Sequence, residues 1–181
     1  MTIALYIFLV FMEFALLVSF LVYIATVTYS IFFGSFYVAT KQKEVDIFLK
    51  EAALKKDQYF LELGSGDGRT LRTAAKMYQV IGKGIDINPV LTILARILTN
   101  IQHVKGIEFK TENVMKTELS QADVVYIFLM PKLIAKLEKR MLIETKKGAL
   151  LISHGFELHA FKSKQTNIIQ RKPFPTYFYK V

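Results

Sequence analysis

The chain has 181 residues, of which 52% are hydrophobic, and it carries 24 Lys and Arg against 15 Asp and Glu, a net charge of +9. It contains no cysteine, which excludes a disulfide framework and fits a reducing compartment. No metal-ligand spacing is visible in the sequence.

Residues 1–40 form an apolar segment with one charge, Glu13, and no proline, Lys or Arg. About 20 such residues suffice to cross a bilayer, so the sequence predicts one transmembrane helix from about residue 5 to 29. A signal peptide fits less well, because it needs a basic start and a shorter apolar run. A buried soluble helix would need a deeper core than this chain can build. We therefore expect 1–40 to be a membrane anchor, with an aromatic belt at 29–37.

The charge distribution predicts how this helix is oriented. All basic residues lie beyond residue 40, so residues 41–181 carry a net charge of +10. Positive charge beside a span stays on the cytoplasmic side. We expect a single-pass protein with its N-terminus outside and its domain facing the cytoplasm, or the matrix of an organelle.

Residues 41–181 are expected to form one domain in which helices and strands alternate, the pattern of a doubly wound parallel sheet. Helices are predicted at 45–54, 68–78, from 89 onward and at 132–145. Strands are predicted at 59–63, within 80–87, and at 107–110, 123–129 and 149–154, with a closing antiparallel pair at 167–171 and 176–180.

The helix that begins at Pro89 has the clearest start signal. Asn88 is a good N-cap, and proline is favoured at the first helical position. Its apolar residues recur at helical spacing, so the sequence predicts that they face the core. These residues are Val90, Leu94, Ile97, Leu98 and Ile101.

A glycine-rich turn follows the first strand, and Asp86 ends the second strand about 20 residues later. Glycines 64, 66 and 68 allow positive φ angles and close approach of a ligand. An acid at the position of Asp86 suits a ribose hydroxyl pair, which indicates a nucleoside-binding crevice. A dinucleotide site needs a third glycine where Arg69 stands. The alternative role for Asp86, capping the next helix, is weakened because Asn88 already supplies the cap.

The string Glu62-Leu63-Gly64-Ser65-Gly66-Asp67-Gly68 resembles motif I of class I S-adenosylmethionine (SAM) methyltransferases. The resemblance implies a Rossmann-like α/β fold with a seven-stranded, mostly parallel sheet, and SAM as cofactor. Glu62 or Asp67 would meet the ammonium of SAM, Asp86 its ribose, and Asn113 its adenine amine. The full expected set of cofactor-binding residues is Glu62, Gly64, Ser65, Gly66, Asp67, Gly68, Asp86, Ile87, Asn113 and Phe128.

A closer resemblance is to the membrane-anchored lysine methyltransferases that modify the ATP synthase c-subunit and the adenine nucleotide translocase. It rests on the string 123–131, on Leu137-Glu138-Lys139-Arg140, and on Ser153-His154-Gly155-Phe156. It implies a lysine of a membrane protein as methyl acceptor. The family's Tyr-Val-Pro-Ser/Thr segment reads Tyr37-Val38-Ala39-Thr40 here, so its proline is missing.

Catalysis of lysine methylation requires a neutral lysine. A desolvated site lined by Tyr37, Phe128 and Pro131 would lower the cost of deprotonation. No dedicated base is evident. His154 is the best candidate, and its alternative is a satisfied histidine at a strand end, which we favour.

Other acceptors remain open. The anchor would equally serve methylation of a lipid or quinone, and the basic domain invites RNA. Enzymes that methylate exocyclic amines of nucleic acids use Asn/Asp-Pro-Pro-Tyr/Phe, whereas this chain has Phe128-Leu129-Met130-Pro131, so nucleic acid is disfavoured. The basic charge could instead hold the domain against anionic lipid headgroups. A non-catalytic SAM-binding membrane protein is a further alternative.

Overall fold

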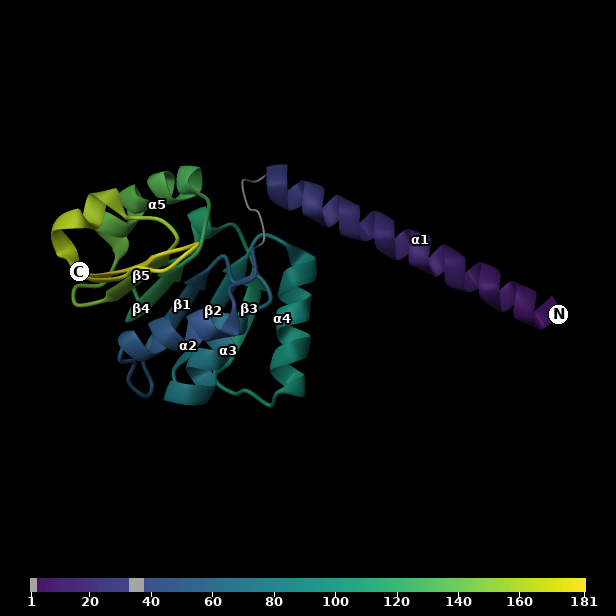
Figure 1. Ribbon diagram of the computed structural model, residues 1–181, viewed down its shortest axis with the longest axis horizontal. Coiled ribbons are helices and arrows are strands. Elements are labelled where there is room, and N and C mark those ends of the chain that lie inside the picture. The colour runs from purple at the N-terminus through teal and green to yellow at the C-terminus, as the bar shows by residue number, and fades with distance from the viewer. Residues whose placement is uncertain (1–2, 33–37) are drawn as a thin grey trace.

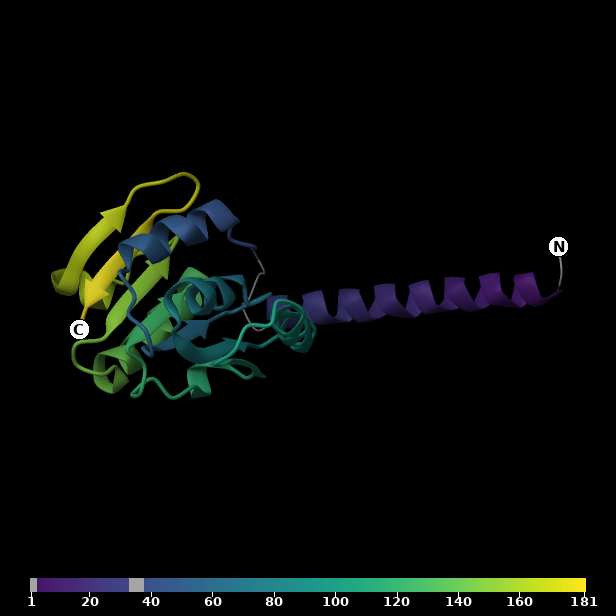
Figure 2. The same ribbon diagram turned by 90° about the horizontal axis from the view of Figure 1, so that it is seen from below.

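The computed structural model describes residues 3–32 and 38–181 (Figure 1). Helix α1 (Ile3–Phe32) projects away from a compact domain in both views (Figures 1 and 2). Residues Ile3–Ala25 are long and apolar enough to cross a bilayer, and none of this stretch is buried against the domain. The predicted N-terminal apolar helix is therefore present.

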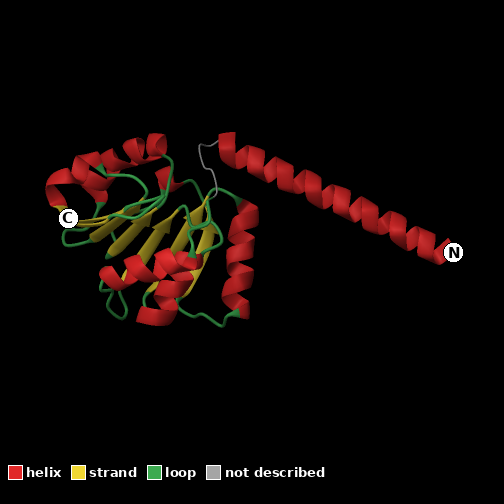
Figure 3. Cartoon of the chain, viewed as in Figure 1, coloured by secondary structure: helices red, strands yellow, loops and turns green. Residues whose placement is uncertain are grey.

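The domain is built on a seven-stranded sheet (Figure 3). Its order is β3-β2-β1-β4-β5-β7-β6, where the first five strands are parallel and β7 pairs antiparallel with both neighbours. The predicted seven-stranded, mostly parallel sheet is confirmed. The strands are β1 (Tyr59–Leu63), β2 (Ile81–Asp86), β3 (Ile107–Thr111), β4 (Val124–Ile127), β5 (Leu150–His154), β6 (Gln165–Ile169) and β7 (Thr176–Lys180).

Helices cover both faces of this sheet, each over its own apolar cluster. One face carries α2 (Gln42–Glu51), α3 (Arg69–Tyr78) and α4 (Pro89–Ile101). The other carries α5 (Pro131–Glu144) and the short 3-10 helices η1 (Val114–Lys116) and η2 (His159–Lys164). The central strands alternate between the two clusters: Phe60 and Tyr126 face the first, whereas Leu61 and Ile127 face the second.

The predicted elements are all present, and their bounds shift by a few residues. The largest shift is in α2, which was expected at 45–54. It begins earlier because the Lys41 carbonyl accepts the amides of Glu44 and Val45. It ends earlier because Ala53 takes a left-handed conformation, with φ of 46°, which breaks the helical path.

The predicted orientation of α4 is wrong. Its inward face consists of the small residues Thr92, Ala95 and Thr99, and the predicted apolar stripe points away from the sheet. Val90, Leu94, Ile97 and Ile101 are exposed and Leu98 is half-buried. The N-cap is as predicted, since Asn88 Oδ1 accepts the amides of Val90 and Leu91 at 2.9 and 3.3 Å.

The phenyl ring of Phe109, on β3, explains this inversion. It is buried beneath α4, where it fills space left by the missing side chains of Gly68 and Gly84. A Cβ at either glycine would collide with the ring, and a Cβ at Gly68 would also lie 3.0 Å from that of Ala95. Only small side chains on α4 fit above so large a ring, so the bulky apolar residues must lie on its other face.

Candidate functional site

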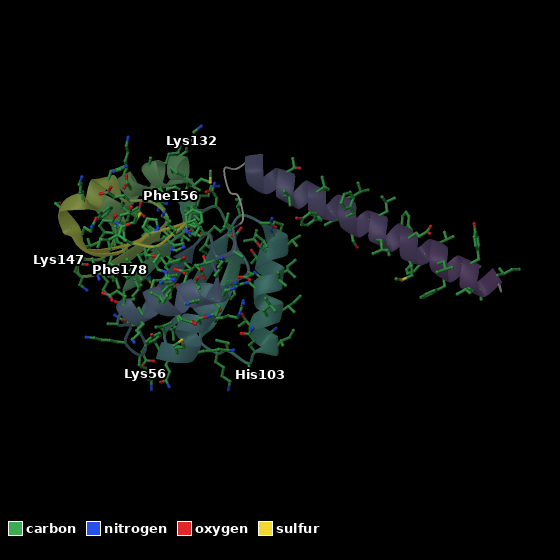
Figure 4. All side chains as sticks on the ribbon, viewed as in Figure 1. Lys56, His103, Lys132, Lys147, Phe156 and Phe178 are labelled. Carbon is green, nitrogen blue, oxygen red and sulfur yellow. The ribbon has the colours of Figure 1, made fainter. Side chains whose placement is uncertain are left out.

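A crevice lies beyond the carboxyl ends of β1, β2 and β4, where parallel sheets bind ligands. A smaller hollow adjoins it and shares Gly64, Asp86 and Leu129 with it. Figure 4 shows Phe156 near this end of the domain, with Lys56 and His103 at the opposite end. The crevice is lined by Val38, Ala39, Thr40, Glu62, Gly64, Ser65, Gly66, Asp67, Arg69, Thr70, Asp86, Tyr126, Phe128, Leu129, Met130, Phe156 and Phe174.

The glycine turn forms the floor of this crevice. Gly64, Gly66 and Gly68 have φ of 80°, 51° and 75°, so each takes the left-handed conformation predicted for the turn. The amides of Gly64 and Ser65 both donate to the Ile85 carbonyl at 2.8 and 2.9 Å, which fixes the turn to β2. A Cβ on Gly64 would lie 2.6 Å from Leu129 Cδ2. The turn is thus shaped for close backbone approach.

Asp86 joins the glycine turn to the start of α4. Its Oδ2 accepts the Gly66 amide and its Oδ1 accepts the Asn88 amide, both at 2.8 Å. The carboxyl group is buried, which raises its pKa above the usual range of an aspartate. Each oxygen has a further lone pair and both pockets reach the residue, so Asp86 can also accept hydroxyl groups.

Glu62 is a buried carboxyl group at the end of β1. Its Oε2 accepts the Leu71 amide at 3.1 Å, at the start of α3. Burial raises its pKa to about 8, so the group is mostly protonated at pH 7. A cationic group in the crevice would favour the ionised form. Glu62 is therefore suited to meet an ammonium group of a ligand.

Arg69 organises the loop beside this carboxyl group. Its guanidinium binds Asp67 Oδ2 at 3.0 Å and the carbonyl oxygen of Thr40 at 2.8 Å. The resulting contact joins the segment that follows α1 to the glycine turn. Asp67 also accepts the Arg69 amide, so its carboxylate is already engaged with Arg69, whereas Glu62 has no cationic partner within salt-bridge distance among the described residues.

Asn113 and Ile87 line the smaller hollow, together with Val114 and Leu133. The side-chain oxygen of Asn113 accepts the Met115 amide at 2.9 Å and caps η1. The same oxygen was expected to accept an adenine amine, and it retains one lone pair for that contact. The apolar neighbours suit the flat face of a base.

Ser65 Oγ, a buried hydroxyl group in the crevice wall, lacks a hydrogen-bond partner among the described residues, whereas the buried Tyr126 hydroxyl lies beside the side chains of Thr40 and Thr70. Buried polar atoms are normally paired, so unsatisfied ones point to a missing ligand or water. Burial raises the pKa of the Tyr126 phenol, which keeps it protonated. The crevice therefore offers the turn, two acids and the Ser65 hydroxyl to a polar ligand such as SAM.

Aromatic rings form the opposite wall. The rings of Phe128 and Phe174 pack edge to face with centroids 5.3 Å apart, and Phe156 lines the crevice beside them. Phe128 follows β4, Phe156 follows β5 and Phe174 lies between β6 and β7. Such a wall excludes water from whatever enters from this side.

The candidates for catalysis are placed differently from one another. Phe128 lines the crevice as expected, whereas Pro131 is exposed as the first residue of α5 and is absent from the lining. Tyr37 lies outside the described residues. Of the predicted lining, Phe128 is thus in the crevice and Pro131 is outside it, because the proline starts a helix, and a catalytic role for these residues stays a prediction.

His154 lies behind the aromatic wall and does not line the crevice. Its Nδ1 lies 2.8 Å from Thr176 Oγ1, and its ring packs edge to face on Phe128 with centroids 4.8 Å apart. Burial lowers its pKa to about 4, so it is neutral at pH 7 and a weak base. These contacts support the alternative of a satisfied strand-end histidine.

Several lining residues were not singled out from the sequence. Tyr126 and Phe156 lie within strings that carried the family resemblance, which is the signal that could have identified them. Thr40 also lies in a string that matched the family, but its contact with Arg69 uses the backbone carbonyl oxygen, which no side-chain pattern reveals. Phe174 is brought to the crevice by the β6–β7 connection, which no local pattern reveals.

Comparison with known proteins agrees with this geometry. Residues 62–165 match the ANTKMT methyltransferase domain family. The chain is 32% identical over 137 residues to a protein-lysine N-methyltransferase of Saccharolobus islandicus, a match that covers 71% of this chain and 81% of that protein. It is 32% identical over 98 residues to a rat lysine N-methyltransferase named for the c-subunit of ATP synthase, covering 53% of this chain but only 44% of the rat protein.

A solved structure shares most of the fold. The RNA methyltransferase of Salinibacter ruber, crystallised with S-adenosyl-L-homocysteine, superposes with a TM-score of 0.74 at 27% sequence identity. The match covers 80% of this chain and 94% of that one.

Proposed function

The chain belongs to the ANTKMT methyltransferase domain family and is a SAM-dependent methyltransferase, and on that premise we propose that it methylates a lysine side chain of a membrane protein. The observation that carries the proposal is the crevice with two unlike walls. One wall offers carboxyl groups and backbone to a nucleoside, and the other offers aromatic rings to an acceptor.

The cofactor would occupy the polar side of the crevice. Asp86 would receive the ribose hydroxyls, Glu62 the ammonium, and the hollow around Ile87 and Asn113 the adenine. SAM supplies an electrophilic methyl group on sulfur. The main task left to the chain is then to align an acceptor with that group.

The aromatic wall would receive the lysine. A free lysine has a pKa of about 10.4, so removing its proton at pH 7 costs about 4.6 kcal/mol. Burial beside Phe128, Phe156 and Phe174 disfavours the ammonium form and lowers this cost. The neutral amine would be oriented by Tyr126, which lines the crevice and whose hydroxyl can accept or donate a hydrogen bond.

Helix α1 would hold this crevice at the membrane. Its stretch Ile3–Ala25 is 23 residues long, enough to span a bilayer. Since the basic residues lie only beyond residue 40, the domain would be on the cytoplasmic or matrix side. Val38–Thr40 line the crevice, so the acceptor site would lie close to the membrane surface.

The direct test is to add tritiated SAM to native membranes and separate labelled protein, lipid and RNA. We expect label in protein, at a lysine identified by mass spectrometry, and much less label at that lysine with the variant Asp86→Ala when SAM is limiting. RNA is the second candidate, favoured by the Salinibacter structure and by the basic domain. Label confined to RNA or lipid would overturn the lysine proposal.

A further inference from the structure

The outward face of α4 is an unusual surface for a small domain. It presents a stripe of branched apolar side chains with fractional exposures between 40% and 67%. The stripe recurs at the spacing of one helix face, diametrically opposite Thr92, Ala95 and Thr99. It consists of Val90, Ile93, Leu94, Ile97 and Ile101, and we call it the α4 stripe.

No charge interrupts the α4 stripe. Helix α4 contains no acidic residue, and its one basic residue, Arg96, turns its guanidinium to the Phe109 carbonyl at 2.9 and 2.7 Å. Elsewhere on the described helices of the domain, large exposed apolar side chains are isolated or adjacent in sequence, as at Met77 and at Leu142 and Ile143. Single residues of that kind are ordinary, whereas a continuous stripe marks an interaction surface.

The position of α4 indicates what covers the stripe. In Figures 1 and 2, α4 forms the side of the domain from which α1 departs, and it lies crosswise to α1. Figure 4 shows side chains projecting outward from α4 on this side. Five residues separate α1 from Val38, so whatever their conformation the gap is at most about 22 Å. A domain so tethered to a spanning helix stays within reach of the lipid.

Length decides how α4 could meet lipid. With 13 residues it is about 20 Å long, too short to cross a hydrocarbon core of about 30 Å. A short helix with one apolar face and no acidic residue instead suits the interfacial plane, with its apolar side at the boundary between headgroups and acyl chains.

We propose that α4 lies in the membrane interface and inserts the α4 stripe into the lipid bilayer. This inference rests on the proposed membrane attachment through α1. It adds a second contact that α1 alone cannot supply, because one helix leaves the domain free to rotate about its tether. Two contacts would fix the crevice in one orientation, since the amide of Asn88, the N-cap of α4, donates directly to Asp86 in the crevice.

The sequence makes a clean test possible, because it contains no tryptophan. We would place a single tryptophan in the full chain at Ile97 on the α4 stripe, and repeat the experiment at Ile93. The matched control is Ile143→Trp, at a more exposed apolar position on α5, which covers the opposite sheet face. Leu16→Trp reports on α1. Each variant is reconstituted into phosphatidylcholine vesicles with plain or brominated acyl chains.

Brominated acyl chains quench a tryptophan that reaches them. We expect Ile97→Trp, Ile93→Trp and Leu16→Trp to lose about half of their emission or more, and Ile143→Trp to lose almost none. Unchanged SAM binding in calorimetry would show that each variant is folded.

Two results would overturn the inference. If Ile97→Trp emits like Ile143→Trp, the stripe does not enter lipid. If its emission is blue-shifted but unquenched, another protein surface, such as a second copy of the chain, covers it. The Leu16→Trp variant tests the proposed membrane span separately. If only Leu16→Trp is quenched, α1 is inserted and the α4 inference fails. If only Ile97→Trp is quenched, α4 contacts lipid and the proposal that α1 spans the membrane fails.

Discussion

At the scale of single residues, Asp86 combines a structural and a ligand-binding role. Its two oxygens accept the Gly66 and Asn88 amides, so one carboxyl group links the glycine turn to the start of α4. The residue also lines both the crevice and the adjoining hollow. Removing the carboxyl group therefore disturbs both the shape of the pocket and its contact with ribose.

We expect Asp86→Ala to weaken SAM binding about tenfold to a hundredfold, the worth of one or two hydrogen bonds to a charged group. Calorimetry well below the melting temperature would measure the dissociation constant. Asp46→Ala, a change at a carboxylate on α2 that contacts Gln42, is the control and should leave binding unchanged. Equal affinity in the two variants would remove Asp86 from the cofactor site.

Two glycines with positive φ allow strain to be separated from ligand contact. Gly66 and Gly148 have φ of 51° and 84°, so alanine at either should cost about 1–2 kcal/mol of stability. Only Gly66 lines the crevice. We expect Gly66→Ala to weaken SAM binding severalfold and Gly148→Ala to leave it intact at the same loss of melting temperature. A similar affinity for both would show that the turn does not contact the cofactor.

Glu62 should give the free enzyme a distinct pH dependence. Its pKa is about 8 when folded and about 4.5 when unfolded. Across this window the unfolded chain binds fewer protons than the folded one, so stability falls as pH rises from about 4.5 to about 8. Glu62→Gln lacks this titration. The melting temperature of Glu62→Gln minus that of wild type should therefore increase as pH rises from about 4.5 to about 8 and be constant above that. A difference that does not change with pH would contradict the raised pKa of Glu62.

At the scale of secondary structure, the sequence predicts an element correctly where its hydrophobic pattern agrees with the burial seen in the structure. The glycine turn, β1 and the Asn88 cap follow from local chemistry, and the mostly parallel sheet follows from the alternation of helices and strands. The crevice followed from these elements, because parallel strands bring their carboxyl ends together. Phe174 could not be predicted, since its position depends on how β6 and β7 pair with the far side of the sheet.

The orientation of α4 could not be predicted for a different reason. Periodicity identifies an apolar stripe, but it does not identify what the stripe contacts. The ring of Phe109 occupies the space beneath α4, and no pattern within α4 records this. The apolar stripe is therefore predicted to face the core, whereas in the structure the face made of small side chains packs against the sheet.

Substitutions on the two faces of α4 would test the observed orientation. Ala95→Leu should destabilise the protein by about 1–3 kcal/mol, because the added atoms have no room beside Phe109. Ile97→Ala should change stability in detergent by less than about 0.5 kcal/mol. Were Ile97 in the core, its loss would cost about 2–5 kcal/mol. Chemical denaturation of both variants would distinguish the two orientations.

At the scale of the whole molecule, the apolar helix α1 is followed closely in the chain by residues that line the crevice. Val38–Thr40 line the crevice, and Arg69 holds the Thr40 carbonyl. A chain that begins at residue 41 therefore loses part of the pocket, whereas one that begins at residue 38 keeps it. The two truncations separate the contribution of this lining from that of α1.

We expect residues 38–181 to bind SAM as the full chain does, and residues 41–181 to bind severalfold less tightly. Both should methylate the native membrane partner poorly, because α1 would no longer hold the crevice beside it. Calorimetry and tritium transfer into native membranes would measure the two effects. Full methylation by residues 38–181 would show that α1 contributes nothing to recognition of the partner.

The Phe109 ring also has an evolutionary consequence. It fills the space of two absent side chains and sits against a third small one, so the residues at 68, 84, 95 and 109 share one fixed volume. A smaller residue at 109 would open a cavity, and a larger one at 84 or 95 would displace the ring. Relatives that lose the phenyl ring should therefore carry a compensating larger side chain at 84 or 95, so these positions should drift together.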